Sequence, residues 1–172
     1  ERYKEYFGKD GGITLSGGEP LVQAEFAKEI FSLCKDRGIN TCLDTSGCIL
    51  TDDVKSLLDL TDRVLLDIKY TNNEDYLKHV GCSMDKPLEF LEYLNSKKIP
   101  TTLRQVVIPT INASEENFSK LKEIEEKYTA ILNRENATLT TAIDYLNESI
   151  QSITMPGISD LTVQQNQHGF NN

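Results

Sequence analysis

Eight residues in four stretches of the chain combine types that suit binding of a charged ligand. They are Gly17, Gly18, Glu19 and Pro20 in one turn, Asp44 at the end of an apolar run, Asp67 and Lys69 within a second run, and Arg104 within a third. Paired glycines let backbone groups approach a ligand closely, because no Cβ stands in the way. Charges inside apolar segments are costly to bury unless they are well paired, which favours a functional role.

Each stretch also has an interpretation without a ligand. The glycine pair suits a tight strand-to-helix connection, with Pro20 in the first helical turn. Asp44 suits a cap on the turn that follows it. Asp67 and Lys69 share a strand face and suit a simple buried ion pair, while Arg104 suits solvation at a rim. These residues alone leave both interpretations open.

The elements that position these residues alternate between strand and helix patterns. Apolar or alternating runs predict strands over residues 13–16, 39–44, 64–69 and 101–108. Helical spacing of apolar residues predicts helices from 21 up to Gly38, over 54–60, over 88–94 and over 114–128, the last with Ser114 as its N-cap. This alternation predicts an α/β fold with a parallel sheet, open or closed into a barrel. Ligands bind such folds at the carboxyl ends of the strands, so we expect the polar residues to meet at one rim.

Length and charge limit the classes of partner. A chain of 172 residues predicts a single domain. A net charge of −9 and a pI near 4.7 disfavour nucleic acid and anionic membranes as partners. The absence of a long apolar run and of a signal peptide predicts a cytoplasmic protein. Because the first residue is Glu1 rather than methionine, we expect the sequence to begin inside a longer protein.

The four cysteines follow no metal-binding spacing. We expect Cys34, on a helix pattern, and Cys42, on a strand pattern, to be buried core thiols. Cys48 and Cys82 fall in loops, and neither has a neighbouring Cys or His in the sequence to suggest a ligand or redox role. His79 is expected on a surface helix.

Four motifs occur in an order that resembles the radical S-adenosylmethionine (SAM) family, in particular the activating enzymes of glycyl radical enzymes. The motifs are SGGEP, CLDTSG, VLLDIK and LRQVVIP. The resemblance covers about residues 1–128. It implies a partial (β/α)6 TIM-like barrel with parallel strands, whose rim binds S-adenosyl-L-methionine against a [4Fe-4S] cluster.

The resemblance also assigns roles to the residues at the rim. The turn of Gly17, Gly18, Glu19 and Pro20 would receive the methionine amino group of the cofactor, and Lys69 would pair with its carboxylate. Arg104 would lie near the cofactor and the substrate peptide. Asp44 and Asp67 would lie near the cofactor and, with Thr45, form a monovalent-cation site. No residue is assigned as catalytic with certainty.

The implied chemistry is reductive cleavage of the cofactor to a 5′-deoxyadenosyl radical, which takes hydrogen from a backbone glycine of a partner. That partner would be a glycyl radical enzyme such as pyruvate formate-lyase, and flavodoxin or ferredoxin would donate the electron. No nucleic acid or membrane partner is implied.

The chain departs from the family pattern at both ends. The family binds its cluster through a CxxxCxxC loop upstream of the glycine turn, and this chain has no cysteine before Cys34. We therefore expect the cluster ligands upstream of Glu1 and expect this chain alone to be inactive. Residues 129–172 form a divergent tail, in which we expect an amphipathic helix over about 138–154 followed by disorder.

Two other functions remain open from the sequence. One is a non-catalytic partial barrel that binds a protein or peptide, which the missing cysteine loop favours. The other is a phosphate-binding α/β enzyme that uses Gly17 and Gly18 as an anion cradle, which Glu19 disfavours because it would repel the anion.

Overall fold

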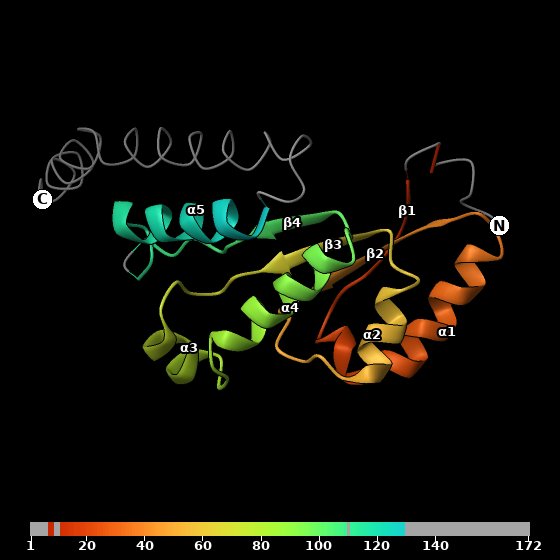
Figure 1. Ribbon diagram of the computed structural model, residues 1–172, viewed down its shortest axis with the longest axis horizontal. Helices are drawn as coiled ribbons and strands as arrows, with labels where there is room; N and C mark the ends of the chain where they lie inside the picture. Colours follow the sequence, from red (N-terminus) through yellow and green to blue (C-terminus); the bar gives the residue numbers. More distant parts are fainter. Residues whose placement is uncertain (1–6, 9–10, 110, 130–172) are drawn as a thin grey trace, which may run out of the picture.

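The computed structural model describes residues 7–8, 11–109 and 111–129 and contains a sheet of four parallel strands (Figure 1). The strands are β1 (Gly12–Leu15), β2 (Asn40–Thr45), β3 (Arg63–Asp67) and β4 (Thr101–Arg104), and they lie side by side in chain order. Each is joined to the next through one or more helices, as parallel strands require. The predicted α/β fold is confirmed, and the sequential order is that of a partial barrel.

Helices follow each strand, and some of them begin at a side-chain cap. They are the 3-10 helix η2 (Pro20–Gln23) and the α-helices α1 (Ala24–Lys35), α2 (Asp52–Leu58), α3 (Asn73–His79), α4 (Asp85–Ser96) and α5 (Glu115–Thr129). Thr51 caps α2 by accepting a hydrogen bond from the N–H of Val54. The predicted N-cap of α5 is confirmed, because the Ser114 hydroxyl accepts from the N–H of Asn117 at 3.2 Å.

The sheet has one face covered by helices and one face with charged side chains. Along β2, β3 and β4 buried residues alternate with partly exposed ones. The buried residues pack against α1, α2 and α4, which lie along the sheet in Figure 1, and α5 packs against α4. Asp44, Asp67 and Arg104 are among the partly exposed set. The alternation therefore places all three on the face that α1–α5 leave open within the described residues.

Strand β4 is shorter than the predicted segment 101–108. After Arg104 the strand ends; Asn117 donates to the side chain of Gln105, whereas Asn112 bonds the backbone of the segment. Asn112 accepts from the N–H of Ile108 at 2.6 Å and donates to the carbonyl of Val106 at 2.8 Å. These side-chain bonds replace the ladder bonds that would have continued the strand.

The apolar residues of α1 do not all face the core. Phe26 and Leu33 are 60% and 56% exposed, and the buried face is formed by Ala24, Ala27, Phe31 and Cys34. The predicted helix over 138–154 and the disorder expected after it lie outside the described residues. In the part of the chain that is described, no helix has the length and apolar character to cross a membrane.

Candidate functional site

A polar pocket of about 450 Å³ lies where the four strands end. Seven of the eight predicted site residues line it, all except Pro20, together with Ser16, Thr45 and Ser46. Asp67 and Arg104 are direct register partners on β3 and β4. The volume is within the range of small-molecule sites. The structure thus brings together residues that the sequence places in four separate stretches.

Gly17 and Gly18 form the part of the wall contributed by the turn after β1. Both have positive φ, 88° and 57°, which glycine adopts without strain. A Cβ built on either residue meets no atom within 4 Å, so the space beside them is open. Backbone at this turn is therefore accessible to a ligand.

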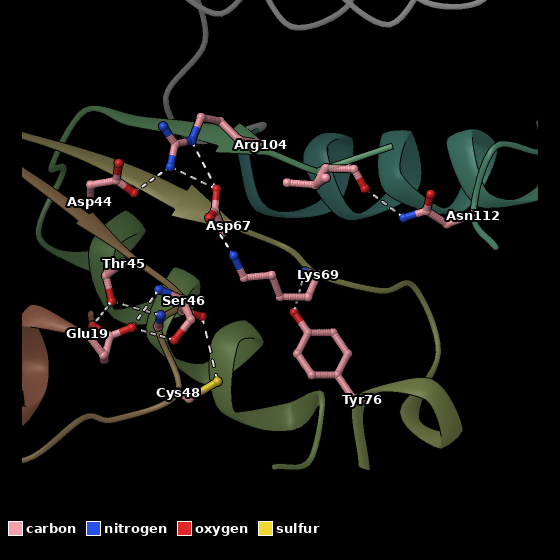
Figure 2. A network of polar contacts seen from close by, with 12 residues as sticks. Glu19, Asp44, Thr45, Ser46, Cys48, Asp67, Lys69, Tyr76, Arg104 and Asn112 are labelled. Carbon is pink, nitrogen blue, oxygen red and sulfur yellow. Dashed lines mark hydrogen bonds and ion pairs between the residues drawn. The ribbon is translucent and has the colours of Figure 1, made fainter. Parts of the chain in front are cut away.

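The carboxylate of Glu19 joins the turn after β1 to the turn after β2. One oxygen, Oε1, accepts from the N–H of Leu21 at 3.1 Å and from the Thr45 hydroxyl at 2.6 Å. The other, Oε2, accepts from the N–H of Ser46 at 2.9 Å and from its hydroxyl at 2.6 Å. Figure 2 shows Thr45 and Ser46 turned toward Glu19. Four donors occupy this carboxylate, so Glu19 acts first as a clamp between the two turns.

Arg104 lies between two carboxylates from neighbouring strands (Figure 2). Its guanidinium bonds Asp67 through Nε at 3.0 Å and is also hydrogen-bonded to Asp44. Burial alone would lower the pKa of Arg104, but the charges of Asp67 and Asp44 outweigh it and raise that pKa above its ordinary value. Arg104 therefore remains a cation and neutralises part of the charge of the two carboxylates.

Lys69 completes the charged group on the other side of Asp67. Its Nζ donates to Asp67 Oδ2 at 2.6 Å, so the expected ion pair forms, but both side chains are partly exposed rather than buried. Its backbone N–H donates to the hydroxyl of Tyr76, a fully buried residue of α3, at 2.9 Å. Burial raises the pKa of Tyr76, which keeps the phenol protonated. Tyr76 thus fixes the backbone that presents Lys69.

The proposed cation-site residues do not point at one another. Arg104 occupies the space between Asp44 and Asp67, and the Thr45 hydroxyl is bonded to Glu19. In this arrangement the guanidinium takes the position that a cation between the two carboxylates would need. A monovalent-cation site at Asp44, Thr45 and Asp67 stays a prediction.

Some features of the site region were missed or differ from expectation. Ser46 lines the pocket but was not predicted as a site residue. Its position directly after Thr45 in the sequence was the signal that could have identified it. Tyr76 had no sequence signal, because its contact with Lys69 depends on how α3 packs.

The predictions for the cysteines are only partly confirmed. Cys34 is buried as predicted, whereas Cys42 is only half-buried and lines a second cavity of about 340 Å³. His79 is the last residue of α3 and is exposed, so the expected place on a surface helix is confirmed. Its ring stacks on Tyr70, with ring centroids 5.2 Å apart.

Comparison with known sequences gives a consistent result. The family model described as the Radical SAM superfamily matches residues 1–122. The chain is 42% identical over 115 residues to the pyruvate formate-lyase 1-activating enzyme of Escherichia coli K12, covering 66% of this chain and 47% of that protein. It is 40% identical over 129 residues to the pyruvate formate-lyase-activating enzyme of Listeria monocytogenes, covering 71% and 52%. The chain therefore spans about half the length of the curated relatives it matches.

Comparison with solved structures supports the same fold. A domain of a pyruvate-formate lyase-activating enzyme from Bacteroides vulgatus superposes with a TM-score of 0.62 at 24% identity, covering 68% of this chain and 73% of that one. Streptococcus suis SuiB bound to S-adenosylmethionine superposes with a TM-score of 0.57 at 15% identity, covering 73% and 30%. At these identities the likeness shows the fold alone.

Proposed function

The chain belongs to the radical SAM superfamily, and on this basis we propose that its pocket binds S-adenosylmethionine as part of an activating enzyme for a glycyl radical enzyme. The observation that carries the proposal is the convergence of glycines, carboxylates and cations from the ends of four strands on one pocket. The similarity to pyruvate formate-lyase-activating enzymes over about 70% of the chain supports it.

The charge pattern of the pocket matches the amino-acid end of the cofactor. That end has an ammonium, a carboxylate and a nearby sulfonium cation. Asp44 and Asp67 supply negative charge, and Lys69 and Arg104 supply positive charge. In our proposal Lys69 pairs with the cofactor carboxylate, because the described contacts hold its ammonium through one carboxylate only, whereas Arg104 is held by two. Lys69 is then the cation that turns more easily toward a ligand.

In our proposal, the backbone of the turn at Gly17 and Gly18 binds the cofactor ammonium. The open space beside both glycines lets a ligand lie against that backbone. Glu19 contributes by holding the turn in place, because Leu21, Thr45 and Ser46 already donate to its carboxylate. We propose that Asp44 and Asp67 face the remaining positive charge.

The described residues do not fit a [4Fe-4S] cluster. Within residues 7–8, 11–109 and 111–129, no three His, Cys, Asp or Glu side chains gather in a way that could hold a metal ion. Bound S-adenosylmethionine would supply, on one-electron reduction, the 5′-deoxyadenosyl radical that takes a hydrogen atom from a partner glycine. The proposed partner is a pyruvate formate-lyase-like enzyme, with flavodoxin or ferredoxin as electron donor, and the proposed core is residues 1–128, with 129–172 as a separate region.

Calorimetric titration of the full chain with S-adenosylmethionine tests the proposal. Replacing Lys69 by Ala removes a charge-assisted bond, which is worth about 1.5–3 kcal/mol, so the affinity should fall by about 10-fold or more. Asp44→Ala should also weaken binding. A parallel titration with 5′-methylthioadenosine, which lacks the amino-acid end, should respond little to Lys69→Ala.

The matched control is Lys97→Ala, which removes a surface lysine paired with Asp59 at 3.6 Å and away from the pocket. It should leave both affinities unchanged. Wild-type affinity in both the Lys69 and Asp44 variants would refute the proposed site. Capture of a peptide without any cofactor binding would favour the non-catalytic partial barrel instead.

A further inference from the structure

Two cysteines that are far apart in the sequence lie in contact beside the pocket. The Sγ atoms of Cys48 and Cys82 are 2.9 Å apart, although 34 positions separate the residues. Cys48 lies in the loop between β2 and α2, and Cys82 in the loop between α3 and α4. A disulfide bond is about 2.05 Å long, so a shift of about 1 Å brings the two sulfurs to bonding distance.

The backbone holds both sulfurs in this position. Each cysteine follows a glycine with positive φ, Gly47 at 67° and Gly81 at 81°. Gly47 is buried, and a Cβ on it would approach Leu66 Cδ1 to 2.6 Å and the Phe90 ring to 3.2 Å. The turn that presents Cys48 is therefore packed directly on the core. A fixed approach of two thiols lowers the entropic cost of joining them.

The chemical surroundings of the two thiols differ. Cys48 Sγ lies 3.8 Å from the carbonyl oxygen of Ser46, to which its S–H can donate. Burial, with a further contribution from the neighbouring Cys48, raises the pKa of Cys82 to about 12. Cys82 is therefore protonated at neutral pH, and burial is the main reason. Both residues are partly exposed, so a small oxidant can reach them.

We propose that Cys48 and Cys82 are a redox modification site that forms a reversible intramolecular disulfide with a low-molecular-weight disulfide, RSSR, as oxidant. The Cys48 thiolate attacks one sulfur of RSSR and releases one RS⁻, leaving a mixed disulfide on Cys48. Cys82 then loses its proton and attacks Cys48 Sγ, which releases the second RS⁻. Both thiol protons end on the two RSH molecules, and the two electrons lost by the protein reduce RSSR.

The disulfide would join loops that support opposite sides of the pocket. Two residues before Cys48, Ser46 donates twice to Glu19. Shortly before Cys82, α3 carries Tyr76, which accepts from the N–H of Lys69. Oxidation would therefore connect the Glu19 side of the pocket to the Lys69 side through a covalent bond. This inference rests on the sulfur contact and does not depend on which ligand the pocket binds.

The test is differential alkylation of the full chain after equilibration with mixtures of oxidised and reduced glutathione. Cys42 and Cys48 lie between the same two trypsin sites, Arg37 and Lys55, so Cys42→Ser serves as the reference protein. In that protein Cys82 should lose its alkylation as the oxidised fraction rises. A peptide pair joining Cys48 to Cys82 should appear at a mass two hydrogens below the sum. Protein dimers should be absent from a non-reducing gel.

Two variants in the same background separate the pair from unspecific oxidation. With Cys48→Ser, Cys82 should remain open to alkylation or carry a glutathione adduct, because no second thiol is in reach. With Cys34→Ser, the Cys48–Cys82 link should form as in the reference protein. Loss of Cys82 alkylation in the reference protein without the Cys48–Cys82 peptide pair, or a dominant link from either cysteine to Cys34 or to another chain, would overturn the proposal.

Discussion

Ser46 donates two hydrogen bonds to a single oxygen of Glu19, one from its N–H at 2.9 Å and one from its hydroxyl at 2.6 Å. The residues are 27 positions apart and follow adjacent strands. A carboxylate is suited to this place because it only accepts, and four donors surround it. The shape of the pocket on this side therefore depends on the charge state and geometry of one side chain.

Replacing Glu19 by Gln should destabilise the fold at pH 7. The amide keeps one accepting oxygen, but its NH2 group faces two donors that lose their partner, at a cost of about 2 kcal/mol. The measurement is the urea midpoint, which should fall with an unchanged slope. The control, Glu29→Gln, changes an exposed carboxylate of α1 and should shift the midpoint little. Equal urea midpoints for the two variants would contradict the proposal that Glu19 stabilises the fold by joining the two turns.

Replacing Gly47 by Ala should destabilise the protein by about 3 kcal/mol. About 1 kcal/mol comes from the left-handed backbone and about 2 kcal/mol from the clash with Leu66 and Phe90. Gly38→Ala is the matched control, since Gly38 has a similar φ of 63° but a Cβ there meets nothing within 4 Å. It should cost about 1 kcal/mol. Thermal unfolding compares the two, and an equal loss would show that packing at Gly47 contributes nothing.

Replacing Asp62 by Asn should lower stability in a way that depends on pH. Burial would raise the pKa of Asp62, but the bond from Lys35 and two bonds from Thr41 outweigh it and lower that pKa below its ordinary 3.8. A lowered carboxyl pKa stabilises the fold above the unfolded-state value and loses this effect as pH falls through the folded-state value. Asp62 is 40% exposed, so solvent screening limits the effect to about 1 kcal/mol at pH 7.

Denaturation of wild type and Asp62→Asn between pH 7 and pH 2.5 measures this dependence. The difference in unfolding free energy should be constant down to about pH 4 and then shrink. Glu126→Gln removes an exposed carboxylate of α5 that lies 3.9 Å from Lys122, and should show little difference at any pH. A difference for Asp62→Asn that grows toward low pH would reverse the sign of the argument.

Much of the fold follows from local sequence patterns. The four apolar runs contain the strands, and α1 ends at Lys35, shortly before Gly38, whose left-handed conformation suits a helix terminus. Gathering the polar residues at one rim was also predictable, because parallel strands direct their carboxyl ends to one edge. The end of β4 was not, since it depends on Asn112 and Asn117, which bond the chain after Arg104 from a later loop and helix.

The partners within the site could not be predicted from the sequence. Glu19 stands next to two glycines, which suggests a ligand group, but three of the four donors to its carboxylate come from Thr45 and Ser46 after β2. The contact of Cys48 with Cys82 and the bond from Lys69 to Tyr76 likewise join separate loops and helices. Residue types and apolar runs are local properties of the sequence, whereas the pairing of side chains depends on how helices pack on the sheet.

The pairing of Asp67 with Arg104 across β3 and β4 makes formation of the pocket depend on the correct strand register. Because side chains alternate between the two faces of a strand, a slip of β3 by one residue would turn Asp67 toward the helices and bring Val64 and Leu66 to the open face. A misaligned chain would lose the ion pairs with Arg104 and the pocket together. A ligand that needs all four strand ends would therefore select only correctly aligned molecules and stabilise the whole sheet as one unit.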